Sequence, residues 1–242
     1  MLVLLTRPFD EATRSAAKLA AIGHTAVLSP VVEIVPTGAV WPRGVIDAVI
    51  ATSARAFQSL QLAPEWPPPE LRRLVPLYLV GAKTAEAARA CGFEGPLRIT
   101  LDAKALCSVI SDRFEAPTRV LYLAGRDRKS DLEACCADAG LALEVVETYA
   151  AQAAGSLSDE AVQLAAAGAL GAIVHFSRRS GEIFLRLAAD AGLDPATPVH
   201  VAISEDAAAP LQAAALPHVV VATEPNEDAI LALLRKAPEP GA

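Results

Sequence analysis

The chain has 242 residues, of which 53% are hydrophobic, and its formal net charge is −7. This length suits one large or two small domains with a sizeable core. No apolar run reaches the ~20 residues of a membrane helix, and the acidic balance argues against nucleic acid, whose phosphates need a basic face. We therefore expect a soluble cytoplasmic protein in which local groups hold any anionic ligand.

Short apolar strands alternate along the chain with helical stretches of roughly ten to fifteen residues, which is typical of βα units around a parallel sheet. Asp10, Ser53 and Asp102 mark expected helix starts. Gly23 and Gly140 follow expected helix ends, where a left-handed cap is favoured. The pattern predicts an α/β fold.

The same architecture occurs twice in the chain. The stretches "VLLTRPFDEATRSAAKLAAIG" and "VLYLAGRDRKSDLEACCADAG" share an apolar strand, a polar turn with an arginine, an amphipathic helix and a closing glycine. The repeat alone predicts two halves, 1–112 and 118–236. The matched segments are 3–23 with 120–140, 48–60 with 172–184, 77–90 with 199–212, and 98–110 with 219–234.

Polar turns follow the apolar strands, with the sequences TRP, TSAR, VGAKT, GRDR, FSRR and ISED. Strand-to-helix turns of a parallel sheet lie at its carboxyl edge, so two sheets would gather these turns on two edges facing a shared cleft. Helix N-termini at such edges favour carboxylates or phosphates. The arrangement predicts a site for a polyanion.

Common cofactor and catalytic signatures do not occur in the sequence. It contains no G-x-G-x-x-G, no G-x-x-x-x-G-K-[ST] and no G-x-S-x-G, and its four histidines form no ligand-spaced set. Cys91, Cys107, Cys135 and Cys136 show neither metal-site spacing nor the density of a secreted disulfide framework. We expect them to be reduced, buried or half-buried thiols.

Seven motifs, TRP, TSARAF, YLVGAKTAEAA, LYLAGRDR, VVETY, FSRRSG and AIS, follow one another over nearly the whole chain. Their order and spacing resemble those of the uroporphyrinogen-III synthases of tetrapyrrole biosynthesis. The resemblance implies two Rossmann-like α/β domains with parallel sheets facing a shared cleft, joined by a two-stranded connection. It places 1–35 with 153–242 in a discontinuous first domain and 41–148 in a second, with linkers at about 36–40 and 149–152.

The resemblance also implies a reaction. Members of this family cyclise the linear hydroxymethylbilane with inversion of ring D and loss of water, through a spiro intermediate. The acetate and propionate groups of this substrate make it a polyanion, and no cofactor or metal is implied. We expect a cytoplasmic monomer that binds a small molecule and neither a membrane nor nucleic acid, with a transient contact to the preceding pathway enzyme left open.

Site residues follow from the same resemblance. Tyr149 in VVETY matches the tyrosine that assists departure of the hydroxyl, whereas a structural alternative is that its ring fills the ladder between the domains. The serines of the turns also suit helix caps, and the arginines also suit the solvated surface or ion pairs. The expected substrate-binding residues are Ser53, Arg55, Gly81, Thr84, Arg126, Ser177, Arg178 and Ser204.

Some residues depart from the family pattern. Glu205 and Asp206 fall at the edge of the ISED turn, where they would repel a polyanion unless they point away or the turn makes no contact. The basic residues Arg178 and Arg179 could compensate this charge, and Arg128 is an alternative to Arg126.

Two other functions stay open at this point. Paired sheets would also suit a two-lobed module that closes on an anionic ligand without catalysis. A glycosyltransferase with two Rossmann-like domains is disfavoured, because the sequence has no recognisable nucleotide-binding signature.

Overall fold

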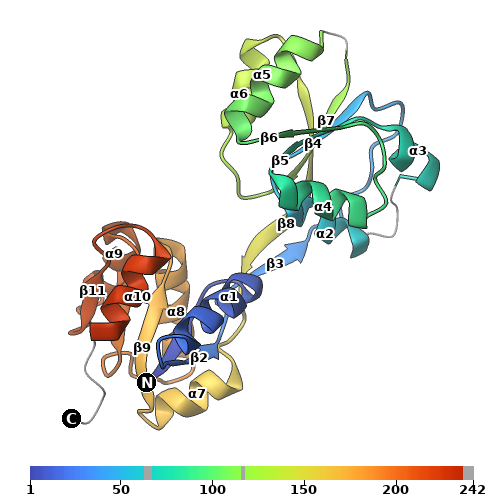
Figure 1. Ribbon diagram of the computed structural model, residues 1–242. Helices are drawn as coiled ribbons and strands as arrows, with labels where there is room; N and C mark the ends of the chain where they lie inside the picture. Colours follow the sequence, from blue (N-terminus) through green and yellow to red (C-terminus); the bar gives the residue numbers. More distant parts are fainter. Residues whose placement is uncertain (63–66, 116–117, 237–242) are drawn as a thin grey trace. The chain divides into compact units, whose positions relative to one another are not determined.

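The computed structural model describes residues 1–62, 67–115 and 118–236, which form two units with separate sheets (Figure 1). Unit 1 consists of Met1–Glu33 and the described part of Gln152–Ala242, and unit 2 of Ile34–Ala151. Both are α/β units with mostly parallel strands, which confirms the predicted fold class.

Unit 1 has a five-stranded sheet in the order β11-β10-β9-β1-β2, in which all neighbouring strands are parallel. Side chains of α1 and α10 pack with β1 and β9 in the cluster on one face, whereas α7 and α8 cover Leu4 and Ile173 on the other face. The strands are β1 (Leu2–Leu5), β2 (Thr25–Leu28), β9 (Leu170–His175), β10 (Val199–Ala202) and β11 (Val219–Val221). The helices are α1 (Phe9–Ala20), α7 (Asp159–Ala166), α8 (Arg178–Asp190), α9 (Glu205–Ala213) and α10 (Glu227–Lys236).

Unit 2 has a six-stranded sheet in the order β3-β8-β7-β4-β5-β6, with β8 to β6 parallel. One face carries a cluster with α2 and α4, and the other a cluster with α5 and α6. The strands are β3 (Val32–Pro36), β4 (Ala48–Ala51), β5 (Leu77–Val80), β6 (Leu97–Thr100), β7 (Val120–Gly125) and β8 (Leu143–Ala153). The helices are α2 (Ala54–Gln58), α3 (Pro69–Leu74), α4 (Ala82–Ala90), α5 (Ala103–Arg113) and α6 (Asp131–Asp138), with a 3₁₀ turn at Ser59–Leu62.

The local signals explain most of these boundaries. Ser53 and Asp102 cap α2 and α5, as predicted. Gly23 and Gly140 adopt positive φ values of 81° and 77°, so both end their helices in the left-handed region that favours glycine. Asp10 lies within the first turn of α1, whose N-cap is Pro8, and it favours the helix through its charge instead of a cap.

The expectation of four reduced thiols is wrong for two cysteines. Cys107 on α5 and Cys135 on α6 form a disulfide, with their Cα atoms 6.3 Å apart. Both helices cover the same face of the unit 2 sheet, so residues separated by 28 positions in the sequence meet there. Cys91 and Cys136 are buried thiols outside this disulfide, as expected.

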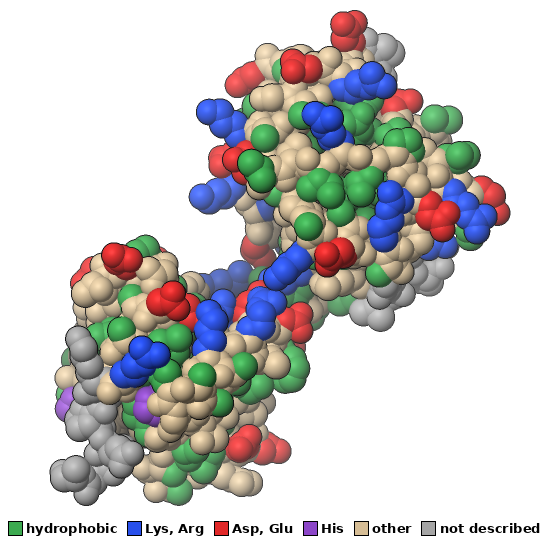
Figure 2. All heavy atoms as spheres, viewed as in Figure 1, with side chains coloured by type: hydrophobic (Ala, Val, Ile, Leu, Met, Phe, Trp, Pro, Cys, Tyr) green, Lys and Arg blue, Asp and Glu red, His purple; other side chains and the backbone are tan. Residues whose placement is uncertain are grey.

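No helix within the described ranges is long and apolar enough to cross a membrane. On the face shown in Figure 2, basic and acidic side chains are interspersed over each unit, with hydrophobic side chains between them.

Candidate active site

Tyr149 lies at the carboxyl edge of the unit 2 sheet, opposite Gly125 at the end of β7. Its main-chain carbonyl accepts a hydrogen bond from the N–H of Arg126 (2.8 Å). Its half-buried ring packs against the hydrophobic cluster that includes Ala56 and Phe57 of α2. Within the described part of the chain the phenol has no hydrogen-bond partner, so its O–H is available to donate.

Two arginines beside Tyr149 share one carboxylate. Arg126 Nε lies 3.1 Å from Glu147 Oε2, and Arg128 Nη1 lies 3.0 Å from Glu147 Oε1. Arg128 Nε also pairs with Glu133 Oε1 at 2.7 Å. The hydrogen bonds from Arg128 and then from Arg126 hold the pKa of Glu147 below its usual value. Two guanidinium groups therefore meet at this edge with one carboxylate between them.

The Ser53 turn and the Gly81 turn lie at the same edge, after β4 and β5. Ser53 Oγ accepts a hydrogen bond from the N–H of Arg55 (3.3 Å), so the serine does cap α2. Gly81 has φ +78°, which explains the choice of glycine, and its N–H donates to the carbonyl of Thr100 (3.0 Å). Thr84 lies inside α4 and is only 4% exposed, so it does not cap the helix.

The edge of the unit 1 sheet carries two longer, serine-capped helices. Ser177 and Ser204 accept hydrogen bonds from the N–H three residues further on, at 3.2 and 3.3 Å. Arg178, the first residue of α8, pairs with Asp206 of α9 at 2.9 Å, and both side chains are exposed. The pair places opposite charges together at this edge, so Asp206 is not an isolated negative charge.

Arg7, in the TRP turn, is a residue of this edge that the sequence-based list did not include. Its guanidinium carbon lies 4.0 Å from the ring centroid of Phe176, and its Nη1 lies 3.2 Å from Glu227 Oε1. Glu227, at the start of α10, also pairs with Lys18. The TRP motif could have indicated Arg7 as a site residue, because an arginine directly after the first strand of a parallel sheet lies at its carboxyl edge.

The sequence-based prediction also did not include Glu147 or the hydroxyl pair of Thr52 and Tyr122 at the unit 2 edge. Thr52 Oγ1 lies 3.1 Å from the Tyr122 hydroxyl. Burial is the main cause that raises the pKa of the Tyr122 phenol. Tyr122 belongs to β7, all of whose residues are buried. In such an apolar strand the sequence does not indicate that the Tyr122 hydroxyl has a polar partner.

Two buried histidines lie in neighbouring strands of unit 1. His175 Nε2 and His200 Nδ1 are 3.0 Å apart, and His200 Nε2 lies 2.8 Å from the carbonyl of Pro195. Both rings pack against Phe184. Burial lowers the pKa of His175 well below its usual value, with a further contribution from His200, and burial also lowers the pKa of His200. Both rings are therefore neutral core groups near neutral pH.

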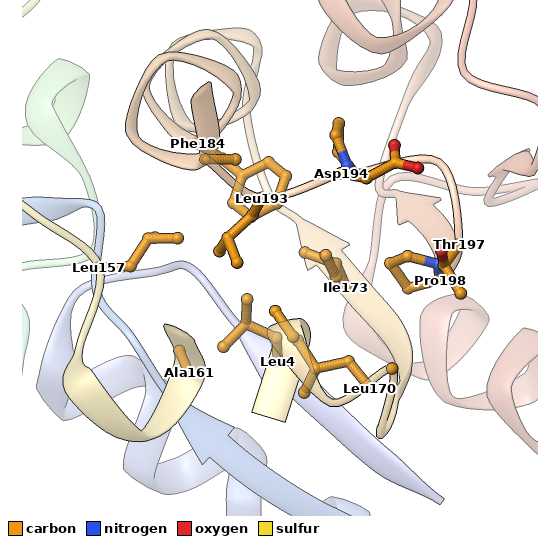
Figure 3. A pocket seen from close by; sticks show the side chains of 14 residues that line it. Leu4, Leu157, Ala161, Leu170, Ile173, Phe184, Leu193, Asp194, Thr197 and Pro198 are labelled. Carbon is orange, nitrogen blue, oxygen red and sulfur yellow. The ribbon is translucent and has the colours of Figure 1, made fainter. Parts of the chain in front are cut away.

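Two hollows among the described residues lie away from these edges. In unit 1, a cavity of about 20 Å³ is enclosed by Leu157, Leu170, Ile173 and Phe184, whose side chains surround it in Figure 3. This volume holds about one water molecule, and the apolar lining offers few partners. A wider groove of about 450 Å³ contacts Pro76 and Pro96, which precede β5 and β6 and so lie at the amino edge of the unit 2 sheet.

Each unit thus places part of the predicted catalytic and substrate-binding residues at the carboxyl edge of its sheet. Among the described residues, no group of three or more His, Cys, Asp or Glu side chains could hold a metal ion. Unit 1 carries Ser177, Arg178 and Ser204 at its edge. Unit 2 carries Ser53, Arg55, Gly81, Arg126 and Tyr149 there, with Thr84 buried in the helix that follows Gly81.

Comparison with known proteins supplies the family. The family model described as "Uroporphyrinogen-III synthase HemD" matches residues 13–232. A crystal structure of uroporphyrinogen-III synthetase from Helicobacter pylori 26695 is similar, with a TM-score of 0.59, 17% identity, and 98% of this chain and 99% of that chain covered. A mutant uroporphyrinogen III synthase from the extremely thermophilic bacterium Thermus thermophilus is less similar, with a TM-score of 0.49, 16% identity and 98% of each chain covered. No curated protein sequence matches significantly.

Proposed function

The chain belongs to the uroporphyrinogen-III synthase family, whose members are lyases of porphyrin and heme biosynthesis, and we propose that it cyclises hydroxymethylbilane with inversion of ring D. The observation that carries this proposal is the family match over 13–232, which includes strands and edges of both units. The similarity to the Helicobacter pylori structure supports the two-sheet fold.

The proposed reaction begins with departure of the terminal hydroxyl of hydroxymethylbilane as water. The adjacent pyrrole nitrogen pushes this step, which gives a reactive azafulvene. The substituted carbon of ring D then attacks, and the resulting spiro intermediate fragments and recloses with ring D inverted. Unguided closure would give the uninverted isomer, so the protein must above all hold the chain in one geometry. Positioning of this kind can supply roughly 7 to 11 kcal/mol.

Carboxylate contacts at the two edges supply this positioning in our proposal. The substrate carries several carboxylates, and guanidinium groups bind carboxylates through paired hydrogen bonds. Arg126 pairs with Glu147 through Nε and its side chain is 57% exposed, which supports a role for the rest of its guanidinium in binding a substrate carboxylate. The proposed substrate-binding residues are Ser53, Arg55, Gly81, Thr84, Arg126, Ser177, Arg178 and Ser204.

Tyr149 is the proposed general acid. A phenol is protonated at neutral pH and can donate to a departing hydroxyl. The location of Tyr149 at the sheet edge, and a hydroxyl without a partner in the described ranges, support this role. One positioned acid contributes about 10²–10⁴-fold, which is less than the contribution of geometry.

We further propose that the protein acts on its small-molecule substrate as a cytoplasmic monomer without a cofactor, touching the preceding enzyme of the pathway only transiently. Neither the family match nor the structural similarity supports the alternative of a binding module without catalysis.

The test supplies hydroxymethylbilane to the purified protein and resolves the product isomers. We expect the inverted isomer to form in excess over the uninverted isomer that appears in a protein-free control. The same assay after treatment with a chelator should give an unchanged rate. Exclusive formation of the uninverted isomer, at the rate of the control, would refute the proposed function.

A further inference from the structure

The alternation of side chains along β8 breaks just before Tyr149. Leu143 and Val145 pack against the cluster on the α5/α6 face of the sheet, whereas Val146 packs against the cluster on the α2/α4 face. Successive side chains of a regular strand point to opposite faces, so Tyr149 would belong with Leu143 and Val145. Tyr149 instead packs on the α2/α4 face, with Val146.

A β-bulge at Thr148 causes this change of face. Ala124 of β7 lies opposite Glu147, but the next residue, Gly125, lies opposite Tyr149, so Thr148 is one extra residue in β8. Thr148 Oγ1 donates to the carbonyl of Ala124 (3.3 Å). With 1% of its surface exposed, Thr148 is held inside the sheet.

Thr37, the residue directly after the neighbouring strand β3, also fixes the bulge from the other side. The carbonyl of Thr148 accepts a hydrogen bond from the N–H of Thr37 (3.2 Å). The Thr37 hydroxyl donates to the carbonyl of Glu147. The carbonyl and the hydroxyl of the extra residue are therefore paired, which makes the bulge a defined part of the sheet.

Gly125 leaves the space that the ring of Tyr149 then occupies. A Cβ atom at position 125 would lie 2.7 Å from Cε2 and from Cζ of Tyr149, and 2.9 Å from its Oη. The backbone of Gly125 lies outside the left-handed region, so it would itself accept alanine. The carbonyl of Gly125 accepts a hydrogen bond from Arg128 (3.0 Å), which holds this end of β7 in place. The tyrosine ring is therefore what excludes a side chain at this position.

We propose that Gly125 is a positioning residue for Tyr149, and that it acts together with the bulge at Thr148. The bulge turns the tyrosine to the face that carries the Ser53 turn and α2. The bare Cα of Gly125 then lets the ring lie against the end of β7, and the ring in turn places its hydroxyl at the sheet edge. The catalytic part of this inference rests on the proposed role of Tyr149 as an acid.

A stability cycle tests the seating of the ring without any reference to catalysis. Gly125→Ala should raise the unfolding equilibrium constant roughly tenfold or more, because overpacking is destabilising. In a Tyr149→Ala background the same substitution should have little effect, since the ring that blocks the methyl group is gone. Gly155→Ala is the matched control, because a Cβ at position 155 meets nothing within 4 Å. An equal loss from Gly125→Ala in both backgrounds would overturn the inference.

Fluorine NMR and kinetics show whether the ring has moved. The chain has three tyrosines, so 3-fluorotyrosine labelling gives three signals that Tyr→Phe variants assign. Gly125→Ala, and to a smaller extent Thr148→Val, should shift the Tyr149 signal selectively. Both should lower kcat with little change in KM, with Gly125→Ala lowering it by about tenfold. In a Tyr149→Phe background, kcat should fall no further.

The outcomes separate this inference from the proposed function. Full turnover by Tyr149→Phe would refute the acid role and leave the stability cycle and the fluorine shift to decide about Gly125. An unshifted Tyr149 signal in folded Gly125→Ala would overturn the positioning role, whatever the enzyme does. If Gly125→Ala does not fold but the double variant with Tyr149→Ala does, the proposal is supported.

Discussion

The two sheet edges use similar turns with different chemistry. In unit 1, Ser177 and Ser204 cap helices of 13 and nine residues, and the described ionic groups include Arg178 with Asp206. In unit 2, Ser53 caps a helix of five residues. That shorter turn lies on an edge with a phenol and a carboxylate shared by two arginines. The unit 1 edge also has a shared carboxylate, that of Glu227 with Arg7 and Lys18, so the phenol is the main difference. In our proposal unit 1 binds and orients the substrate, whereas Tyr149 of unit 2 adds the proton donor.

Removal of the phenol should have the largest effect. We expect Tyr149→Phe to lower kcat by about 10- to 100-fold, within the range for loss of one general acid. The residual product should keep ring D inverted, because the binding contacts that set the geometry remain. Thermal stability should barely change, since the hydroxyl has no hydrogen-bond partner in the described ranges. Product isomers and turnover are measured together by chromatography.

The matched control is Tyr78→Phe. Tyr78 packs edge to face against Phe114 and lines the groove at the amino edge of the same sheet. Wild-type turnover in Tyr149→Phe would show that Tyr149 is not the proton donor, so the two edges would not differ in this respect. A switch to the uninverted isomer would show that the tyrosine controls how the substrate folds.

The histidine pair should make the stability of unit 1 depend on pH. Burial is the main cause that lowers the pKa of His175 in the folded protein below its usual 6.5. Below pH 6.5 the unfolded chain therefore binds a proton that the folded chain excludes. The free energy of unfolding is therefore not reduced by this group above pH 6.5, and it decreases as the pH falls below 6.5. One such group costs about 1.4 kcal/mol of unfolding free energy per pH unit, or about 2 kcal/mol between pH 6.5 and pH 5.

Urea unfolding at several pH values measures this dependence. His175→Leu should flatten the slope below pH 6.5 even if it lowers stability at pH 8. An unaltered slope in His175→Leu would place the pH dependence elsewhere in the chain.

Loss of Arg55 should have the smallest effect of the three. We expect Arg55→Ala to raise KM by about three- to tenfold with little change in kcat, as for loss of one carboxylate contact. Arg98→Ala is the control, because Arg98 is exposed and lies by the groove at the amino edge of the same sheet. If both variants behave alike, Arg55 does not contribute to the difference between the two edges.

Much of the fold could be predicted from local patterns. The strand and helix alternation gives the α/β class, and Ser53, Asp102, Gly23 and Gly140 mark helix ends through contacts with their own neighbours. The internal repeat gives strand-turn-helix units but not their order in space. Its halves of 1–112 and 118–236 miss the placement of β1 between β2 and β9.

The site could be predicted only in part, because its details depend on residues distant in sequence. A capping serine is visible in the sequence, but the pairing of Arg128 with Glu133 and Glu147 needs α6 and β8 to be in place. Strand periodicity alone predicts the wrong face of the sheet for the Tyr149 side chain, because one extra residue in β8 reverses the alternation. The disulfide was missed for the same reason, because two helices had to meet first.

The discontinuity of unit 1 has a consequence for synthesis on the ribosome. Strand β1 lies between β2 and β9 in the sheet, yet β9, the central strand, begins only at residue 170. The segment that builds unit 2, Ile34–Ala151, emerges completely before that. We therefore expect unit 2 to fold first, while β1 waits with one hydrogen-bonding edge unpaired. During that interval the nascent chain exposes an apolar strand, and this is the period in which chaperone binding would matter most.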